Sequence, residues 1–259
     1  MVIPAREPYD WERVLEWLGT RAVPAVEAVH DGGFRRVLAD GQVVDIERVP
    51  GGVAVSGEPG DIARVFDLGH DPAALAAAVG ADPVLGTQLA RAPGIRVPGA
   101  WSGFELAVRA VLGQQVSVAG ARRTAEKLVV ALGEPVGDGT ALTHRFPTPE
   151  AVAEGELPGM PAARARALRA LAGAVAGGLR LDPPVDLAAT RAALLALPGF
   201  GPWTVEYVAM RALRDPDAWP GTDLWLRRAT EGADPERWRP WRAYAAMLIW
   251  QVPPVPKGV

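Results

Sequence analysis

The sequence has no cysteine and only three histidines among its 259 residues. Without cysteine, the chain can form neither a disulfide nor a thiolate-ligated zinc or iron–sulfur centre. The histidines, at positions 30, 70 and 144, show no metal-ligand spacing, so no metal site is expected. Apolar runs stop well short of the roughly 20 residues that a membrane helix needs, and the N-terminus lacks a signal-peptide pattern. We therefore expect no membrane contact and a cytoplasmic location.

Basic charge is also scarce. The formal net charge is −3, the sequence pI is about 5.7, and lysine occurs only at positions 127 and 257. This balance is unfavourable for a protein that holds nucleic acid by bulk electrostatic attraction. Nucleic-acid binding would depend instead on groups without formal charge, such as backbone amides and helix termini.

Residues 1–82 are predicted to form a small α+β domain. Alternating apolar positions separated by Asp-Gly and Pro-Gly-Gly turns are typical of an antiparallel meander, and helical periodicity flanks it on both sides. The strand-like runs are 34–39, 43–49 and 53–56, and the helical runs are 10–19, 59–68 and 72–79.

Residues 83–259 show no convincing strand, and proline and glycine separate successive helical runs. This part is predicted to be an all-helical body, which makes the fold class α+β with a small antiparallel sheet at the N-terminus. The helical runs are 101–112, 117–132, 148–155, 161–177, 186–196, 202–214, 223–231 and 235–251.

The segment LPGFGPWT, residues 197–204, joins two of these runs and predicts a helix-hairpin-helix motif over 186–213. Gly199 and Gly201 have no Cβ, so their backbone can adopt left-handed turn angles and their N–H groups can approach another molecule closely. Pro202 suits the first turn of a helix, where no N–H is needed. Unpaired amides at a helix N-terminus form an anion site, and a DNA phosphate is the natural anion for it. An ordinary tight turn between packed helices is the alternative.

A second turn with a similar sequence offers an internal comparison. Residues 157–161 (LPGMP) repeat the opening of the motif but have Pro161 where the first turn has Gly201. Proline has no N–H to donate, so this turn cannot present the same pair of amides. We predict that it is structural.

One acidic residue stands out in the loop 219–224. Asp223 follows Gly221 and Thr222 and precedes the helical run LWLRRAT, which places it at a helix N-terminus. There the macrodipole and the free N–H groups favour the ionised carboxylate. A catalytic carboxylate and a simple helix N-cap are both consistent with this position.

Several of these segments resemble the 3-methyladenine DNA glycosylase II family, which belongs to the helix-hairpin-helix superfamily of base-excision DNA glycosylases. The resemblance rests on LPGFGPWT, on Asp223 some twenty residues later, and on the segments VRAVLGQQVSVAGA and WRPWRAYAAMLIWQ. It extends over residues 9–251, nearly the whole chain. It implies an N-terminal domain that is similar to half of a TATA-binding-protein saddle.

The resemblance implies that Asp223 is the catalytic residue. Breaking an N-glycosidic bond builds positive charge on the sugar, which an ionised carboxylate stabilises; the carboxylate could instead activate a water, and the residues do not decide between these roles. Relatives that also cut the DNA strand have a lysine at the position of Trp203, which has no amine to form a Schiff base. We therefore predict a monofunctional enzyme that leaves an abasic site.

Three aromatic residues match positions that line the family's base pocket. Trp203 and Tyr207 lie four apart on one predicted helix and share a face, and Trp250 ends the last helix. Electron-rich rings attract a cationic alkylated purine by about 0.5–2 kcal/mol per contact. Trp101 and Phe104 are predicted to form a further part of the pocket wall. Core packing is the alternative for each of these residues.

The predicted DNA-contacting residues lie in two turns. Gln114 and Gln115 sit where the family places its intercalating side chain, but the best-known member has leucine at the position of Gln115. The glutamine puts an apolar wedge in doubt and could hydrogen-bond the widowed base instead, while a helix-capping turn is the structural alternative. The hairpin supplies the remaining contacts, Gly199, Phe200, Gly201 and Thr204.

Together these features predict a monofunctional DNA glycosylase that flips alkylated purines out of double-stranded DNA and excises them hydrolytically. The alternatives are a non-catalytic helix-hairpin-helix DNA-binding protein and a bifunctional glycosylase/lyase for oxidised bases. No cofactor is expected, with a monovalent cation on the hairpin's backbone carbonyls as an open alternative. We expect a monomer that is associated with the nucleoid.

Overall fold

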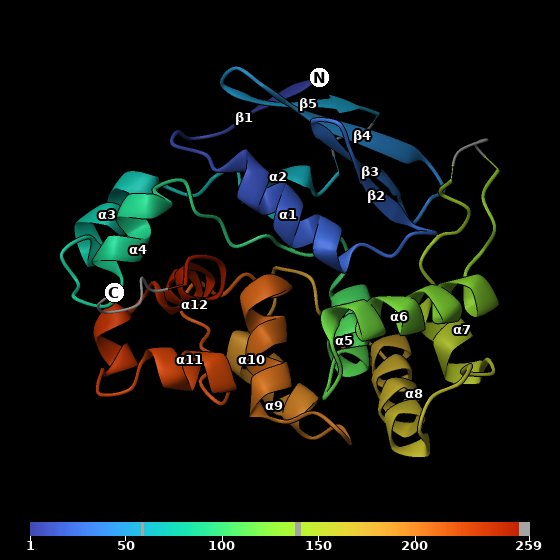
Figure 1. The fold of residues 1–259 in the computed structure, drawn as a ribbon. Coiled ribbons are helices and arrows are strands. Elements are labelled where there is room, and N and C mark those ends of the chain that lie inside the picture. Colours follow the sequence, from blue (N-terminus) through green and yellow to red (C-terminus); the bar gives the residue numbers. More distant parts are fainter. Residues whose placement is uncertain (58–59, 138–140, 254–259) are drawn as a thin grey trace.

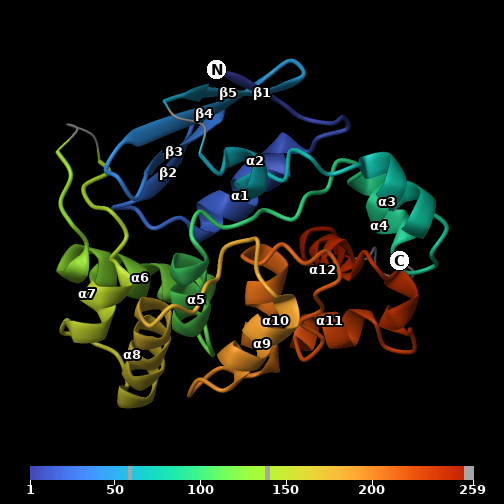
Figure 2. The same ribbon diagram turned by 180° about the vertical axis from the view of Figure 1, so that it is seen from behind.

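The computed structural model describes residues 1–57, 60–137 and 141–253. They form an antiparallel sheet followed by a helical body, which confirms the predicted α+β class (Figure 1). Helix α1 (Trp11–Arg21) lies between the sheet and the helices of the body in both views (Figures 1 and 2). No helix in these ranges has the length and apolar character needed to cross a membrane.

The sheet has two strands more than the three predicted. Its order is β1-β5-β4-β3-β2, and every neighbouring pair is antiparallel. The predicted meander corresponds to β3, β4 and β5, whereas β1 and β2 are edge strands of three and four residues, too short to show a clear alternation. The bounds are β1 (Val2–Pro4), β2 (Glu27–His30), β3 (Gly33–Val37), β4 (Val43–Val49) and β5 (Gly52–Ser56).

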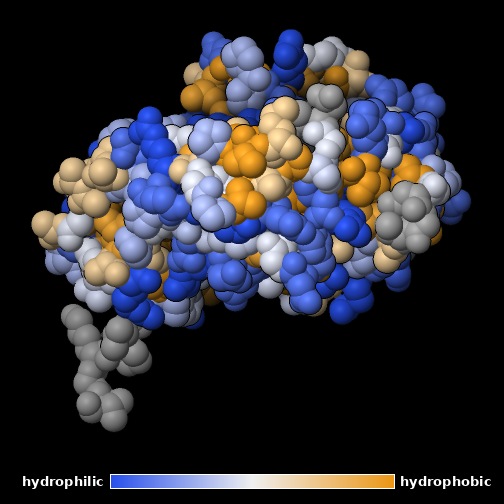
Figure 3. All heavy atoms as spheres, turned by 90° about the horizontal axis from the view of Figure 1, so that it is seen from above, coloured by the Kyte–Doolittle hydropathy of each residue, from blue (hydrophilic) through white to orange (hydrophobic). Residues whose placement is uncertain are grey.

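Alternation along β4 separates the two faces of the sheet. Val44 and Ile46 are fully buried, whereas Asp45 and Glu47 lie on the outer face. Seen from above, this side of the molecule carries hydrophilic residues between separate hydrophobic patches (Figure 3). Such a sheet faces the core on one side and solvent on the other.

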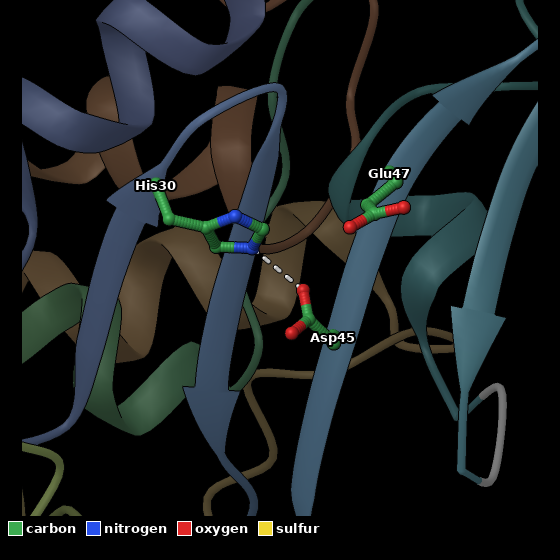
Figure 4. Close-up of side chains that lie close together, drawn as sticks. All are labelled: His30, Asp45 and Glu47. Atoms are coloured by element: carbon green, nitrogen blue, oxygen red, sulfur yellow. Dashed lines mark hydrogen bonds and ion pairs between the residues drawn. The ribbon is translucent and has the colours of Figure 1, made fainter. Parts of the chain in front are cut away.

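The outer face brings His30, Asp45 and Glu47 together from strands β2 and β4 (Figure 4). His30 Nε2 lies 2.6 Å from Asp45 Oδ1, reaching across Gly33, where a Cβ would lie 2.5 Å from the imidazole. Arg35 Nε donates to Asp45 Oδ2 at 2.8 Å. Partial burial acts to raise the pKa of Asp45, but the hydrogen bonds from Arg35 and His30 lower it overall. Both oxygens of Asp45 thus already have hydrogen-bond partners, and sequence spacing could not reveal this cluster.

Between the sheet and the body, the chain forms α2 (Ile62–Val65), α3 (Pro72–Val79) and α4 (Gly86–Arg91). The run predicted at 59–68 is shorter than expected, and its first residue lies outside the described ranges; α4 was not predicted. Helices α3 and α4 lie beside α12 rather than beneath the sheet (Figures 1 and 2). Trp238 Nε1 donates to Asp82 Oδ2 at 2.9 Å. Packing therefore continues across position 82, where the sequence suggested a boundary.

The helical runs of the body match the prediction except near the C-terminus. The run predicted at 235–251 is divided, because Arg239 is extended ahead of Pro240 and the residue before a proline avoids helical angles. An isolated bridge between Pro135 and His144 forms no strand. The bounds are α5 (Gly103–Leu112), α6 (Val118–Leu132), α7 (Pro149–Glu154), α8 (Ala162–Ala176), α9 (Leu187–Leu195), α10 (Pro202–Arg211), α11 (Leu224–Ala229), the 3₁₀ helix η1 (Pro235–Trp238) and α12 (Arg242–Gln251).

A buried group of four charges joins the sheet to the body. Arg36 on β3 donates to Glu27 on β2 and to Glu105 on α5, and all three side chains are at most 5% exposed. Arg109 donates to the same two glutamates and, through Nη2, to the carbonyl of Arg21 at 2.6 Å. Burial acts to raise the pKa of Glu27, but Arg109 and Arg36 lower it overall. The end of α1 is thereby fixed to α5.

Replacing Glu27 with glutamine should leave Arg36 and Arg109 with one carboxylate between them. We expect the free energy of unfolding at neutral pH to fall by about 3–5 kcal/mol. Because the folded pKa is depressed, the ionised Glu27 stabilises the protein above its unfolded pKa of about 4.3, and this contribution is lost as the pH falls through the folded value. The variant should therefore lose less stability than the wild type on acidification, as urea unfolding at several pH values would show. Glu47→Gln, on the exposed face, is the control, and equal stabilities for Glu27→Gln and the wild type would contradict the prediction.

Candidate active site

Asp223 is the N-cap of α11, and its carboxylate accepts from four N–H groups. Oδ1 accepts from the backbone amides of Trp225 and Leu226, each at 3.0 Å. The indole of Trp203 donates to Oδ2 at 3.2 Å and that of Trp250 donates to Oδ1 at 3.4 Å. The capping role and the aromatic surroundings thus occur together, and all four contacts place an N–H donor against a carboxylate oxygen.

The carboxylate lies in a cavity of about 440 Å³ whose wall includes Trp203, Tyr207 and Trp250. The rings of Trp203 and Tyr207 stack, with centroids 5.0 Å apart and planes 8° from parallel. Tyr207 and Trp250 lie 6.3 Å apart at 57°. The structure therefore brings the predicted carboxylate and three of the five predicted pocket aromatics into one cavity.

Trp101 and Phe104 do not line this cavity, which corrects the position predicted for them. Trp101 stacks on Phe34 of the sheet at 6.2 Å and meets the edge of Phe66 at 6.4 Å. Phe104 is 5% exposed and belongs to the core. The segment before α5 faces the sheet, where aromatic partners are available, so the core-packing alternative describes both residues.

Helix α1 contributes two wall residues that sequence reasoning missed. Trp17 lines the cavity and stacks on Trp250, with ring centroids 5.9 Å apart. The guanidinium of Arg21 lies 3.4 Å from the centre of the Trp17 ring. Their spacing of four residues on a helix was the available signal, because it places both side chains on one face. Nothing in the sequence indicated that this face turns toward α12.

The hairpin between α9 and α10 confirms one glycine argument and corrects the other. Gly199 has φ = +81°, the left-handed region that favours glycine. Gly201 has φ = −94°, which any residue adopts, and a Cβ there would meet nothing within 4 Å. Within the described part of the chain, neither amide donates to a protein acceptor. Glycine at position 201 is therefore not needed for the backbone conformation. Its lack of a side chain leaves space for a ligand to reach the amides.

Phe200 and Thr204, which were predicted to contact DNA, are only 5% and 3% exposed. Their side chains pack within the protein, so they can support the hairpin but offer little surface to a ligand.

The turn 157–161 differs from the hairpin as its sequence suggested. Gly159 is also left-handed, with φ = +58°, but Pro161 is the N-cap of α8 and has no N–H. Both turns therefore contain a left-handed glycine, but only the hairpin has a second N–H group, that of Gly201, where the other turn has proline.

The two glutamines between α5 and α6 have different surroundings. Gln114 Nε2 donates to the Gly199 carbonyl at 2.9 Å and to Thr204 Oγ1 at 3.0 Å, so its side chain is tied to the hairpin. Gln115 is exposed and left-handed at φ = +58°, an uncommon conformation for a residue with a Cβ. Val116 and Val118 follow it on the cavity rim and are 42% and 45% exposed. The tip of this turn therefore presents a polar residue followed by two apolar ones.

Arginines without an acidic partner gather on the helices that border the cavity and the hairpin. In the sheet, by contrast, Arg35, Arg36 and Arg48 are all paired with carboxylates. A chain of net charge −3 can therefore still carry unneutralised basic side chains on these helices. The arginines for which the described ranges contain no ion pair include Arg122 and Arg123 on α6, Arg164 and Arg166 on α8, and Arg227 and Arg228 on α11.

Comparison with known proteins agrees with this arrangement. Residues 1–61 and 59–102 match the family model for the AlkA N-terminal domain. The Escherichia coli protein named DNA-3-methyladenine glycosylase 2 is 35% identical over 94% of this chain and 94% of its own length. The chain belongs to the 3-methyladenine DNA glycosylase II family.

Two further relatives extend the comparison. A Mycobacterium tuberculosis protein named "Probable bifunctional transcriptional activator/DNA repair enzyme AlkA" is 42% identical over 96% of this chain, which spans only 56% of that relative. The fold of a 3-methyladenine DNA glycosylase from Archaeoglobus fulgidus matches with a TM-score of 0.80 at 20% identity, over 96% of this chain and 97% of the other. The two proteins thus share a fold over nearly the whole chain.

The two hairpin glycines should respond differently to alanine. Gly199→Ala should destabilise the protein by about 1–2 kcal/mol, because the new Cβ must adopt a left-handed angle and would lie 2.9 Å from the Ala167 methyl. Gly201→Ala should leave the melting temperature unchanged but weaken binding to duplex DNA about tenfold, the equivalent of one charge-assisted hydrogen bond. Thermal melts and fluorescence anisotropy at fixed salt would measure both effects. Wild-type DNA affinity in Gly201→Ala would exclude the hairpin from the interface.

Proposed function

We propose that the protein is a monofunctional DNA glycosylase that turns alkylated purines out of duplex DNA and excises them hydrolytically. The observation that carries this proposal is the Asp223 carboxylate, held by indole N–H groups between aromatic rings in a cavity large enough for a base. A protein that only bound DNA would need neither the carboxylate nor the aromatic walls. The name of the Escherichia coli relative supports the same reaction class.

Asp223 acts on the sugar rather than on the base. As the base leaves, positive charge develops at the anomeric carbon, and a carboxylate already fixed by four N–H donors stabilises it without reorganising. Three of these donors bind Oδ1, so Oδ2 keeps a lone pair for the sugar. This arrangement favours a fixed negative charge over the alternative role, activation of a water.

The aromatic walls bind the extruded base. An alkylated purine carries positive charge, which the faces of Trp203, Tyr207 and Trp250 attract. Extrusion costs a few kcal/mol in lost stacking and pairing, and contacts with these rings offset part of that cost. The positive charge also makes the base a good leaving group, so one carboxylate is enough.

The hairpin amides of Gly199 and Gly201 bind the DNA backbone, and the neighbouring unpaired arginines strengthen the contact. No cofactor takes part in the proposed reaction. A monovalent cation on the hairpin carbonyls remains compatible with the residues: Leu197 O accepts from the Phe200 amide and Gly199 O from Gln114, which leaves a second lone pair on each oxygen. We propose that the protein acts as a monomer on the nucleoid, in the cytoplasm.

Replacing Asp223 with asparagine tests the carboxylate. Asparagine caps a helix as well as aspartate does, so α11 should remain intact. We expect excision of 7-methylguanine and 3-methyladenine from methylated duplex to fall at least about a hundredfold, with binding to abasic DNA preserved. Asp71→Asn is the matched control, because Asp71 caps α3 through two backbone amides away from the cavity. Equal excision by Asp223→Asn and the wild type would remove Asp223 from the mechanism.

Borohydride trapping tests whether the enzyme is monofunctional. A strand-cutting relative forms a Schiff base through the amine of a lysine, and this chain has Trp203 at that position. Lys127 is exposed on α6 and does not line the cavity. Lys257 lies outside the described residues. Incubation with alkylated duplex and borohydride should yield no covalent adduct, and the product strand should break only after alkali. A trapped protein–DNA adduct would establish lyase chemistry instead.

A further inference from the structure

The cavity has ends of opposite character along α10. Trp203, Tyr207 and Arg211 follow one another at successive turns and all line the cavity. The carboxylate of Asp223 is bound at the Trp203 turn, next to the hairpin, and Arg211 lies eight residues further, about 12 Å along the axis. The Asp223 carboxylate thus lies at the end of the cavity next to the hairpin, and the buried Arg211 lies at the opposite end, which is called the inner end below.

Two arginines of this inner end have no acidic partner in the described ranges. Arg211 is 5% exposed and donates only to neutral oxygens, those of Pro98, Gly99 and Tyr207. Arg21 donates to the carbonyl of Trp17 and to the hydroxyl of Thr20. Arg109 also lines the cavity, but Glu27 and Glu105 compensate its charge. The inner end therefore carries net positive charge.

The hydroxyl of Tyr207 is a further hydrogen-bond donor at the inner end of the cavity. Its oxygen accepts from Arg211 Nη1 at 2.8 Å, and no acceptor for its own hydrogen is present in the described part of the chain. Burial acts to raise the pKa of Tyr207, but Arg211 and Arg21 lower it overall. Because the oxygen already faces a cation, the hydrogen is available for a ligand. The guanidinium groups of Arg21 and Arg211 can only donate, and the Tyr207 hydroxyl adds a further donor.

We propose that Arg21 and Tyr207 select damaged purines with a 6-oxo group, such as 7-methylguanine and hypoxanthine, over those with a 6-amino group, such as 3-methyladenine. A carbonyl oxygen can accept two of these donors, whereas an amino group places N–H against N–H and leaves both unpaired. In 7-methylguanine, moreover, the positive charge lies on the five-membered ring, next to the sugar and Asp223. In 3-methyladenine it lies on the six-membered ring, toward the arginines. This selection rests on the proposed glycosylase function and adds a substrate preference to it.

Methylated DNA provides an internally controlled test, because it contains both 7-methylguanine and 3-methyladenine. Chromatography of the released bases gives the ratio of the two initial rates for each variant, so differences in protein activity cancel. We expect Arg21→Met to lower the 7-methylguanine to 3-methyladenine ratio about tenfold, since the site's discrimination depends on a hydrogen bond that the variant cannot make. Arg21→Lys, which keeps a charged donor, should recover part of the ratio. Arg6→Met, which removes an exposed arginine paired with Asp71, should leave it unchanged.

The possible outcomes distinguish a failure of the proposed substrate preference from a failure of the proposed glycosylase function. An unchanged ratio in Arg21→Met, with 3-methyladenine still released, would overturn the selection and leave the glycosylase intact. If the wild type released neither base, the proposed function would fail and the selection with it. Should Arg21→Met not fold by circular dichroism, Tyr207→Phe decides the matter: it keeps the ring and loses the donor, so its ratio should fall in the same direction. A ratio in Tyr207→Phe equal to that of the wild type would then overturn the proposal.

Discussion

An ionised carboxylate between aromatic rings is stable only when N–H groups replace the water that it has lost. Asp223 satisfies this constraint with donors from three helices: the backbone amides that begin α11, the indole of Trp203 on α10 and the indole of Trp250 on α12. The same contacts that keep the charge in place also orient the two indoles. The same hydrogen bonds therefore determine both the position of the carboxylate and the shape of the cavity.

The N-terminal sheet helps to shape the cavity through a buried group of charged side chains. Glu27 and Arg36 on the sheet are bonded to Glu105 and Arg109 on α5, and Arg109 in turn binds the carbonyl of Arg21 at the end of α1. Helix α1 is thus held against the body, with Trp17 stacked on Trp250. A domain for which the sequence suggested no role in the chemistry supplies one wall of the cavity. Buried pairs often add little net stability, but removing one partner is costly, which suits a joint that must keep a fixed geometry.

Much of this arrangement was predictable, and the exceptions share a physical cause. Local signals located the hairpin, Asp223 at a helix N-terminus, and the common face of Trp203 and Tyr207, because each depends on spacing within one segment. The wall residues Trp17 and Arg21 could not be identified in this way, because their role depends on how α1 docks on α12.

Predictions made from residue type were wrong where the type of a residue did not indicate whether its side chain is exposed to solvent. Trp101 and Phe104 precede or begin α5 near the correct turn, yet the sheet offered them aromatic partners and they joined the core. Phe200 and Thr204 belong to the hairpin but are buried under it. Gly201 is free of the strain that its residue type suggested, and open space is what distinguishes it. Each case was decided by tertiary packing, which no single segment records.

The acidic composition, the main objection to a DNA-binding role, loses its force once charge is considered by location. Carboxylates neutralise the arginines of the sheet, whereas the arginines named above on α6, α8 and α11 have no such partners in the described ranges. The hairpin adds two amides that have no acceptor among the residues that the structure describes; such amides attract phosphate and contribute nothing to the formal charge. Salt screens electrostatic attraction beyond the Debye length of about 8–10 Å, so the charges and amides close to the phosphates matter more for binding than the net charge of the chain. An acidic chain arranged in this way should bind DNA weakly at long range and more firmly at the hairpin, which suits an enzyme that must leave each undamaged site quickly.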